Sequence, residues 1–149
     1  FETLSPIPGF RAWVTASLKG ATTHTLPTPV WDRLETYLED IDDDFDANPL
    51  ARDTLLPLCA HYLTHEKKHQ LPIDPVAKFH LGNGALLDKI HWRGDESERG
   101  KELSYGVMVN YVYEPEEIEN RHEAFFSEGR IASSAAVKDL ADSLIGQSG

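Results

Sequence analysis

The sequence is poor in cysteine and in basic residues, and it has no long apolar run. Its single cysteine, Cys59, excludes a disulfide within the chain and fits a reducing compartment. Only 14 of its 149 residues are lysine or arginine, against 25 aspartates and glutamates, which gives a net charge of −11. Because nucleic acids and anionic membranes bind basic surfaces, this balance argues against both as partners. No apolar segment approaches the roughly 18 residues that a membrane-spanning helix needs.

The rest of the composition is typical of a globular protein. Hydrophobic residues make up 40% and aromatic residues 9% of a chain whose length suits one domain with a substantial core. Residues 1–5 (F-E-T-L-S) alternate apolar and polar side chains, which is the period of a half-buried strand. Since the sequence starts within this pattern, we expect the chain to be the C-terminal piece of a longer polypeptide that supplies further strands.

Periodicity predicts several helices and two neighbouring strands after this first strand. Apolar residues recur at helical spacing over 10–19, 30–41, 48–63, 75–81, 115–126 and 135–145. Pro57 is expected either to start a new helix or to kink the third of these helices. Residues 85–92 and 105–113 have the character of strands that can pair, joined by a charged connection with room for one helical turn. This order indicates an α+β fold with a small sheet.

Two stretches place a reactive side chain at the end of a regular element. Ser5 is the last residue of the first strand, and the proline that follows keeps its backbone extended at the start of a stiff turn. Residues 74–85 (D-P-V-A-K-F-H-L-G-N-G-A) open with a helix N-cap and an N1 proline. Their two glycines are free to take left-handed angles and end the helix, so His80 lies in its last turn. Spacing alone equally allows an ordinary turn serine and a core histidine.

Two further segments resemble metal sites without meeting their requirements. Residues 65–69 (H-E-K-K-H) match the zincin pattern, but two lysines separate the histidines and no third ligand follows at the usual spacing. An EF-hand loop starting at Asp40 in the acidic run 39–46 would need glycine where Phe45 stands and glutamate where Ala51 stands. We therefore expect no metal at either segment.

Three blocks, in this order, resemble one protein family. They are 4–10 (L-S-P-I-P-G-F), 74–85 and 108–113 (M-V-N-Y-V-Y), with 58–63 fitting between the first two. Together they resemble the C-terminal catalytic part of malonyl-CoA decarboxylase, and the resemblance extends from the first residue to beyond Tyr113. It implies a GNAT-like sheet (the acyl-CoA N-acyltransferase fold) flanked by helices. It also implies an upstream half that binds the CoA pyrophosphate, and an upstream helical domain through which subunits form a homo-oligomer.

The resemblance further implies an activity and a set of site residues. The family are carboxy-lyases that convert malonyl-CoA to acetyl-CoA and carbon dioxide without metal or organic cofactor. Their catalytic serine, histidine and tyrosine fall on Ser5, His80 and Tyr113, which we also expect to contact the substrate. The expected location is the cytoplasm, or the mitochondrial matrix for a eukaryotic protein, and malonyl-CoA is the expected small-molecule partner.

The chemistry of decarboxylation suits these three side chains. Loss of carbon dioxide from a malonyl thioester leaves an enolate, whose oxygen needs stabilisation and whose carbon needs a proton. We assign acid–base catalysis to His80, hydrogen-bonded to Ser5, and a hydrogen bond to the carboxylate or enolate oxygen to Tyr113. Either Ser5 or His80 can deliver the proton to carbon. Asn110 falls on the opposite face of its strand if alternation holds, so we assign it no catalytic role.

Two other functions use the same residues differently. A Ser–His hydrolase or acyltransferase acting on an acyl-CoA would use Ser5 as nucleophile and His80 as base. Ser5, however, lacks the G-x-S-x-G elbow, and the sequence places no aspartate obviously to orient His80. A non-catalytic acyl-CoA-binding domain would keep the fold without the chemistry, although the joint presence of Ser5, His80 and Tyr113 argues against it. The catalytic interpretation requires Ser5 and His80 to lie within hydrogen-bonding reach.

Overall fold

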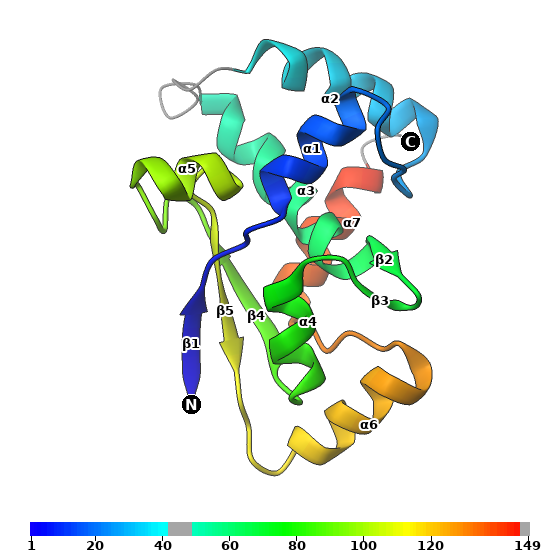
Figure 1. Cartoon of the computed structure of the whole chain (residues 1–149), viewed down its shortest axis with the longest axis vertical. Coiled ribbons are helices and arrows are strands. Elements are labelled where there is room, and N and C mark those ends of the chain that lie inside the picture. The colour runs from blue at the N-terminus through cyan, green and yellow to red at the C-terminus, as the bar shows by residue number, and fades with distance from the viewer. Residues whose placement is uncertain (42–48, 147–149) are drawn as a thin grey trace.

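The computed structural model describes residues 1–41 and 49–146, which form seven helices and five strands (Figure 1). Residues 42–46 of the acidic run lie outside the described residues. In chain order the elements are β1 (Glu2–Ser5), α1 (Phe10–Leu18), α2 (Thr28–Asp40), α3 (Pro49–His65), β2 (Lys67–Lys68), β3 (Leu71–Pro72), α4 (Pro75–Gly82), β4 (Leu86–His91), α5 (Glu98–Ser104), β5 (Met108–Val112), α6 (Ile118–Glu128) and α7 (Ala135–Gly146). The α+β class is therefore confirmed. None of the helices within these ranges is long and apolar enough to cross a membrane.

A three-stranded antiparallel sheet brings together the first strand and the two late ones. The strand order is β1-β5-β4, so the predicted pairing between 85–92 and 105–113 is confirmed, and β1 adds to the far side of β5. In β1, Thr3 is opposite Tyr111 and Ser5 is opposite Val109. Directly opposed residues of antiparallel strands project from the same face. Thr3, Ser5 and Tyr111 therefore share one face of the sheet.

The helices pack beside and beyond the ends of this sheet. Figure 1 shows α4 alongside the strands, with α1, α2 and α3 grouped toward one end of the sheet and α6 toward the other. α3 packs against α7, which in turn contacts β4. The core between α1 and α3 is aromatic, because Phe10 and Trp13 place their rings 5.6 Å and 5.2 Å from that of Tyr62. The turn after Ser5 is thus anchored in the main core.

Helix α3 runs through Pro57 without a break, so the predicted new start at this residue is wrong. A proline inside a helix removes one backbone hydrogen bond and crowds the preceding turn. Leu55 and Leu58, on either side of it, are completely buried. Burial of this kind contributes more to helix stability than local propensity does, which explains why the helix continues.

The connection before β5 holds a longer helix than the single turn expected. The Ser97 hydroxyl accepts a hydrogen bond from the Gly100 N–H at 3.0 Å and so caps α5 at its start. The helix ends at Ser104, and its C-cap residue, Tyr105, has a left-handed φ of 56°. Because a left-handed residue cannot continue a strand, β5 begins at Met108 instead of near residue 105.

Helix α4 has the predicted boundaries, with one difference in its final turn. The Asp74 carboxylate caps it by accepting from the Ala77 N–H at 3.0 Å, and His80 lies in the last turn. Gly82 is the last helical residue, and the left-handed angle falls on Gly84 alone, at φ 88°. A Cβ at Gly84 would also lie 2.4 Å from the Ile118 carbonyl oxygen, so this turn needs glycine for space as well.

The H-E-K-K-H segment does not have the geometry of a zincin helix. His65 ends α3, whereas His69 lies in the turn between β2 and β3 with a φ of 56°, so the two histidines do not share a helix face. Glu66 points inward and is 4% exposed. Its carboxylate accepts from the Thr25 N–H at 2.9 Å and contacts His61 Nε2 at 2.7 Å. Glu66 therefore fastens the loop after α1 to the end of α3.

We expect Glu66→Ala to lower the free energy of unfolding by about 3 kcal/mol, because it leaves buried donors without an acceptor. Although burial opposes ionisation, the hydrogen bonds from His61 and Thr25 lower the pKa of Glu66. The stabilisation is thus present above the unfolded-state pKa and disappears as the pH falls through the folded-state pKa. Urea denaturation at neutral and acidic pH measures both effects. Glu116→Ala, at an exposed position, is the matched control, and an equal loss of stability there would contradict this role of Glu66.

Candidate active site

The structure joins all three predicted site residues in one hydrogen-bonded chain. Ser5 Oγ lies 3.2 Å from His80 Nε2, across 75 residues of sequence, so the expected contact between them is confirmed. The Tyr113 hydroxyl lies 2.5 Å from His80 Nδ1. Thr3 Oγ1 extends the chain at 3.1 Å from Ser5 Oγ. Both nitrogens of one imidazole are therefore engaged by hydroxyl groups. The catalytic roles of the three residues stay predictions.

Three separate elements hold these side chains in place. β1 ends at Ser5, and α4 carries His80 over the face of the sheet from which Ser5 projects. Tyr113 follows β5, and its N–H donates to the Phe1 carbonyl at 2.7 Å, which continues the pairing with β1. The backbone carbonyl of His80 accepts from the Asn83 and Ala85 N–H groups, each at 3.1 Å, so the turn after α4 closes onto His80 itself. Backbone hydrogen bonds thus hold both Tyr113 and His80, the two partners of their side-chain contact, in place.

The imidazole ring of His80 rests on a buried tyrosine. Its centroid is 4.5 Å from that of Tyr111, with the two planes 22° apart, and Tyr111 is 0% exposed. The sequence patterns alone assign no role to Tyr111 or to Thr3. Thr3 stands two positions before Ser5 in β1, and Tyr111 stands two positions before Tyr113, which directly follows β5. This period-two spacing is the signal that would have found them. Asn110, by contrast, is paired with Leu4 on the opposite face, as alternation predicted.

The hydrogen-bonding pattern permits proton transfer along the chain of hydroxyl groups. A neutral imidazole carries one N–H, so one ring nitrogen donates while the other accepts. If Nε2 donates to Ser5, then Nδ1 accepts from Tyr113, and the opposite tautomer reverses both bonds. When the ring stays neutral, moving a proton between Ser5 and His80 therefore also switches Tyr113 between donor and acceptor in its bond with Nδ1. Such an arrangement can pass a proton from the partly exposed Tyr113 toward Ser5.

Burial favours the neutral forms of His80 and Tyr113, the two titratable groups in this series of hydrogen bonds. It lowers the pKa of His80 from 6.5 and raises the pKa of Tyr113 from 10.0. Between its folded-state pKa and 6.5, His80 binds a proton more readily in the unfolded protein. Stability due to His80 therefore rises with pH through that window and is reduced below it.

We expect the His80 imidazole to titrate below 6.5 in the folded protein and near 6.5 after denaturation in urea. NMR spectroscopy of the ring nitrogens as a function of pH measures both values. A folded-state pKa at or above the denatured-state value would contradict the predicted effect of burial.

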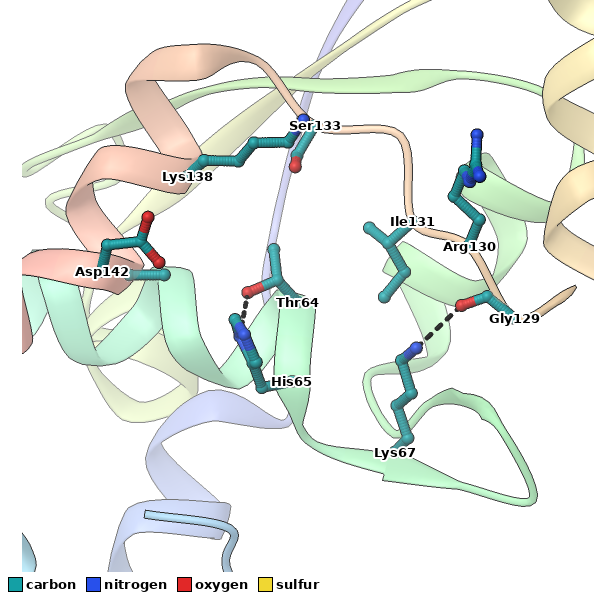
Figure 2. Close-up of a pocket in the computed structure, with 10 residues that line it drawn as sticks. Thr64, His65, Lys67, Gly129, Arg130, Ile131, Ser133, Lys138 and Asp142 are labelled. Atoms are coloured by element: carbon teal, nitrogen blue, oxygen red, sulfur yellow. Dashed lines mark hydrogen bonds between the residues drawn. The ribbon is translucent and has the colours of Figure 1, made fainter. Parts of the chain in front are cut away.

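A separate cavity of about 310 Å³ lies between the end of α3, β2 and α7, and it touches none of the three site residues (Figure 2). In Figure 2, Lys67 reaches across one side of it to the Gly129 carbonyl, at 2.7 Å. Lys138 and Asp142 project from α7 on the other side. Because none of the three site residues lines it, this cavity does not change the assignment of the candidate site.

The fold and this site together are typical of one class of protein, enzymes that transfer protons. An α+β domain that aligns a serine hydroxyl, an imidazole and a phenol has the groups with which enzymes transfer protons. Comparison with known proteins gives the family. The model of the malonyl-CoA decarboxylase C-terminal domain matches residues 1–148. The chain therefore belongs to the malonyl-CoA decarboxylase family, as the three sequence blocks indicated.

Individual relatives agree with this assignment. The mitochondrial malonyl-CoA decarboxylase of Anser anser anser is 33% identical over 92% of this chain, and that of Mus musculus is 32% identical over 94%. Among solved structures, malonyl-CoA decarboxylase from Rhodopseudomonas palustris is 40% identical with a TM-score of 0.81 over 94% of this chain. The Agrobacterium vitis enzyme is 35% identical with a TM-score of 0.72 over 95%. The chain spans about a third of each relative, from 31% to 35% of its length.

Proposed function

We propose that this chain is the C-terminal part of a catalytic domain that decarboxylates malonyl-CoA to acetyl-CoA and carbon dioxide. The observation that carries the proposal is the contact of His80 with Ser5 on one ring nitrogen and with Tyr113 on the other. It occurs in a chain that belongs to the malonyl-CoA decarboxylase family. Ser5, His80 and Tyr113 act both as catalytic residues and as contacts to the malonyl group.

The reaction has two steps that these residues can serve. Breaking the bond between the carboxylate carbon and the methylene carbon releases carbon dioxide and leaves the electron pair on the thioester as an enolate. One proton then adds to the methylene carbon and forms the methyl group of acetyl-CoA. The Ser5–His80 pair delivers that proton, and Tyr113 links His80 to solvent, from which the proton is replaced. A hydrogen bond from one of these hydroxyl groups to the enolate oxygen stabilises the negative charge of that oxygen.

The contacts of His80 favour this reaction over hydrolysis. In a Ser–His–Asp hydrolase, a carboxylate holds the second ring nitrogen and stabilises the imidazolium that forms when serine attacks. Here the second nitrogen, Nδ1, contacts the phenol of Tyr113. A phenol whose pKa is raised by burial provides no negative charge for that purpose. The lowered pKa makes His80 a weaker base toward Ser5, whereas a proton relayed through its ring from Tyr113 to Ser5 leaves the imidazole neutral.

We further propose that the domain has a GNAT-like fold whose other half lies upstream in the polypeptide. β1 is at the edge of the three-stranded sheet, and Leu4 on it is 53% exposed. An open strand edge that carries an exposed apolar residue is normally covered by another element. The upstream half would also hold the CoA pyrophosphate, since a chain with a charge of −11 repels that group unless local donors bind it.

The remaining proposals follow the family. The full-length protein uses malonyl-CoA as its small-molecule partner and no metal or organic cofactor. It forms a homo-oligomer through an upstream helical domain and acts in the cytoplasm or, in a eukaryote, in the mitochondrial matrix. Size-exclusion chromatography with light scattering, applied to the full-length protein with and without that domain, tests the assembly.

Product analysis tests the function. The full-length protein is incubated with malonyl-CoA, and acetyl-CoA, carbon dioxide, malonate and free CoA are quantified. We expect acetyl-CoA and carbon dioxide in equal amounts. Malonate and free CoA would support the Ser–His hydrolase instead, and malonyl-CoA binding without turnover would support a non-catalytic acyl-CoA-binding domain.

A further inference from the structure

One buried carboxylate connects the two parts of the chain that carry Ser5 and His80. Asp74 is 1% exposed. Its Oδ1 accepts from the Gly9 N–H at 3.2 Å and from the Tyr62 hydroxyl at 3.4 Å, and its Oδ2 accepts from the Ala77 N–H at 3.0 Å. The three donors belong to the turn after β1, to α3 and to α4. The role as helix N-cap that the sequence predicted for Asp74 accounts for the contact with Ala77 alone.

The two backbone donors lie close in sequence to the catalytic side chains. Gly9 ends the P-I-P-G turn that begins directly after Ser5, and two prolines stiffen that turn. Ala77 lies in α4, the short helix that ends just after His80. A shift of either segment therefore moves Ser5 Oγ relative to His80 Nε2.

The local geometry leaves little freedom around the carboxylate. A Cβ added to Gly9 would lie 2.4 Å from the Tyr62 hydroxyl and 3.4 Å from Asp74 Oδ1, so the turn approaches this group as closely as a backbone can. The aromatic ring of Tyr62 is itself held against Phe10 in the core, with centroids 5.6 Å apart. Although burial raises the pKa of Asp74, the hydrogen bonds that it accepts oppose this rise and favour the ionised form.

We propose that Asp74 is a positioning residue that sets the distance between Ser5 and His80 by binding the backbone of both segments at once. This inference rests on the proposed function, because it assigns to Asp74 a role in the same decarboxylation. In this role Asp74 binds Gly9, Tyr62 and Ala77 and needs no contact with the substrate. It acts through Ser5 and His80.

Substitution of Asp74 in the full-length protein tests the proposal. Asp74→Asn keeps one acceptor oxygen but turns an amide N–H₂ toward a backbone donor, so one of the two segments is released. We expect kcat for malonyl-CoA to fall by about 10- to 100-fold, the scale on which small displacements of reacting groups act. KM should change by less than about threefold, because the proposed role concerns the chemical step and not ground-state binding. Asp74→Ala releases both segments and should lower kcat further.

A matched control separates positioning from general loss of stability. Ser134 caps α7 in the same manner, accepting from the Val137 N–H at 3.2 Å, but it lies outside the site. Ser134→Ala should lower Tm as a lost N-cap does, with little change in kcat. A loss of kcat in Ser134→Ala that matched the loss in Asp74→Asn would mean that reduced stability alone explains the effect.

A double-mutant cycle with Ser5→Ala gives the decisive readout. If Asp74 acts by placing Ser5 against His80, then adding Asp74→Asn to the Ser5→Ala variant should lower kcat by less than about threefold. Equal costs in the two backgrounds would overturn the proposal, as would wild-type kcat in Asp74→Asn. Failure of the proposed function has a different signature, since the wild-type protein would then produce no acetyl-CoA at all. In that case, a His80 titration curve unchanged by Asp74→Asn would still overturn the positioning role.

Discussion

His80→Asn in the full-length protein is expected to lower kcat for malonyl-CoA by about 100-fold or more, which is the typical effect of losing an acid–base group. Asparagine can reproduce a hydrogen bond to Ser5 or to Tyr113, but it cannot take up and release a proton between them. The contacts of His80 Nε2 and Nδ1, at 3.2 Å and 2.5 Å, would be replaced by a side chain that does not titrate. The steady-state rate of acetyl-CoA formation measures the effect.

The same substitution at another histidine is the control for His80→Asn. His69 is exposed and has a φ of 56°, a conformation that asparagine tolerates well. His69→Asn should therefore keep both the fold and the wild-type kcat. If His80→Asn retained the wild-type rate under these conditions, the acid–base role of His80 would be wrong.

Ser5→Ala should lower kcat to a similar extent, and its effect should not add to that of His80→Asn. The two side chains form one proton-transfer unit, so removing the second after the first removes little further catalysis. We expect the double variant to be within about threefold of the slower single variant. Loss of the Ser5 hydroxyl also deprives Thr3 of its partner at 3.1 Å, but Thr3 keeps its place in β1 through backbone pairing.

Ser127→Ala, at an exposed serine on α6, is the matched control for Ser5→Ala and should leave kcat unchanged. Mass spectrometry of the wild-type protein during turnover separates the two possible roles of Ser5. In the decarboxylase mechanism Ser5 carries no covalent group. An acyl adduct on Ser5 would contradict that mechanism and favour the hydrolase or acyltransferase.

Local sequence signals predicted the helix that carries His80 almost completely. The Asp74 cap, the N1 proline and the glycine-containing turn act within a few residues of the backbone that they shape, so they can be recognised without the rest of the fold. The same holds for the strand character of 105–113, although its first residues are diverted by the left-handed Tyr105. α3 continues through Pro57 because the residues on either side are buried, a property that only the folded chain reveals.

Contacts between distant segments were much harder to predict. Family resemblance, and not periodicity, placed Ser5 together with His80, because nothing local to either residue specifies the other. For the same reason, the sequence predicts the Asp74 cap but not its bond to Gly9, 65 residues away. The stacking of His80 on Tyr111 depends on how α4 lies over the sheet, which is a property of tertiary packing. The bond between Gly9 and Asp74 and the stacking of His80 on Tyr111 thus appear only in the folded chain.

Turnover of malonyl-CoA in D₂O by the full-length protein tests the central claim most directly. If an enolate forms and the Ser5–His80 pair protonates it with a solvent-derived proton, each acetyl-CoA should gain one deuterium in its methyl group. Mass spectrometry of the product measures this incorporation, with a sample lacking enzyme to correct for exchange of the malonyl methylene. We expect singly deuterated acetyl-CoA, formed at a rate that His80→Asn lowers by about 100-fold. Formation of malonate and free CoA, or an undiminished rate in His80→Asn, would contradict the account.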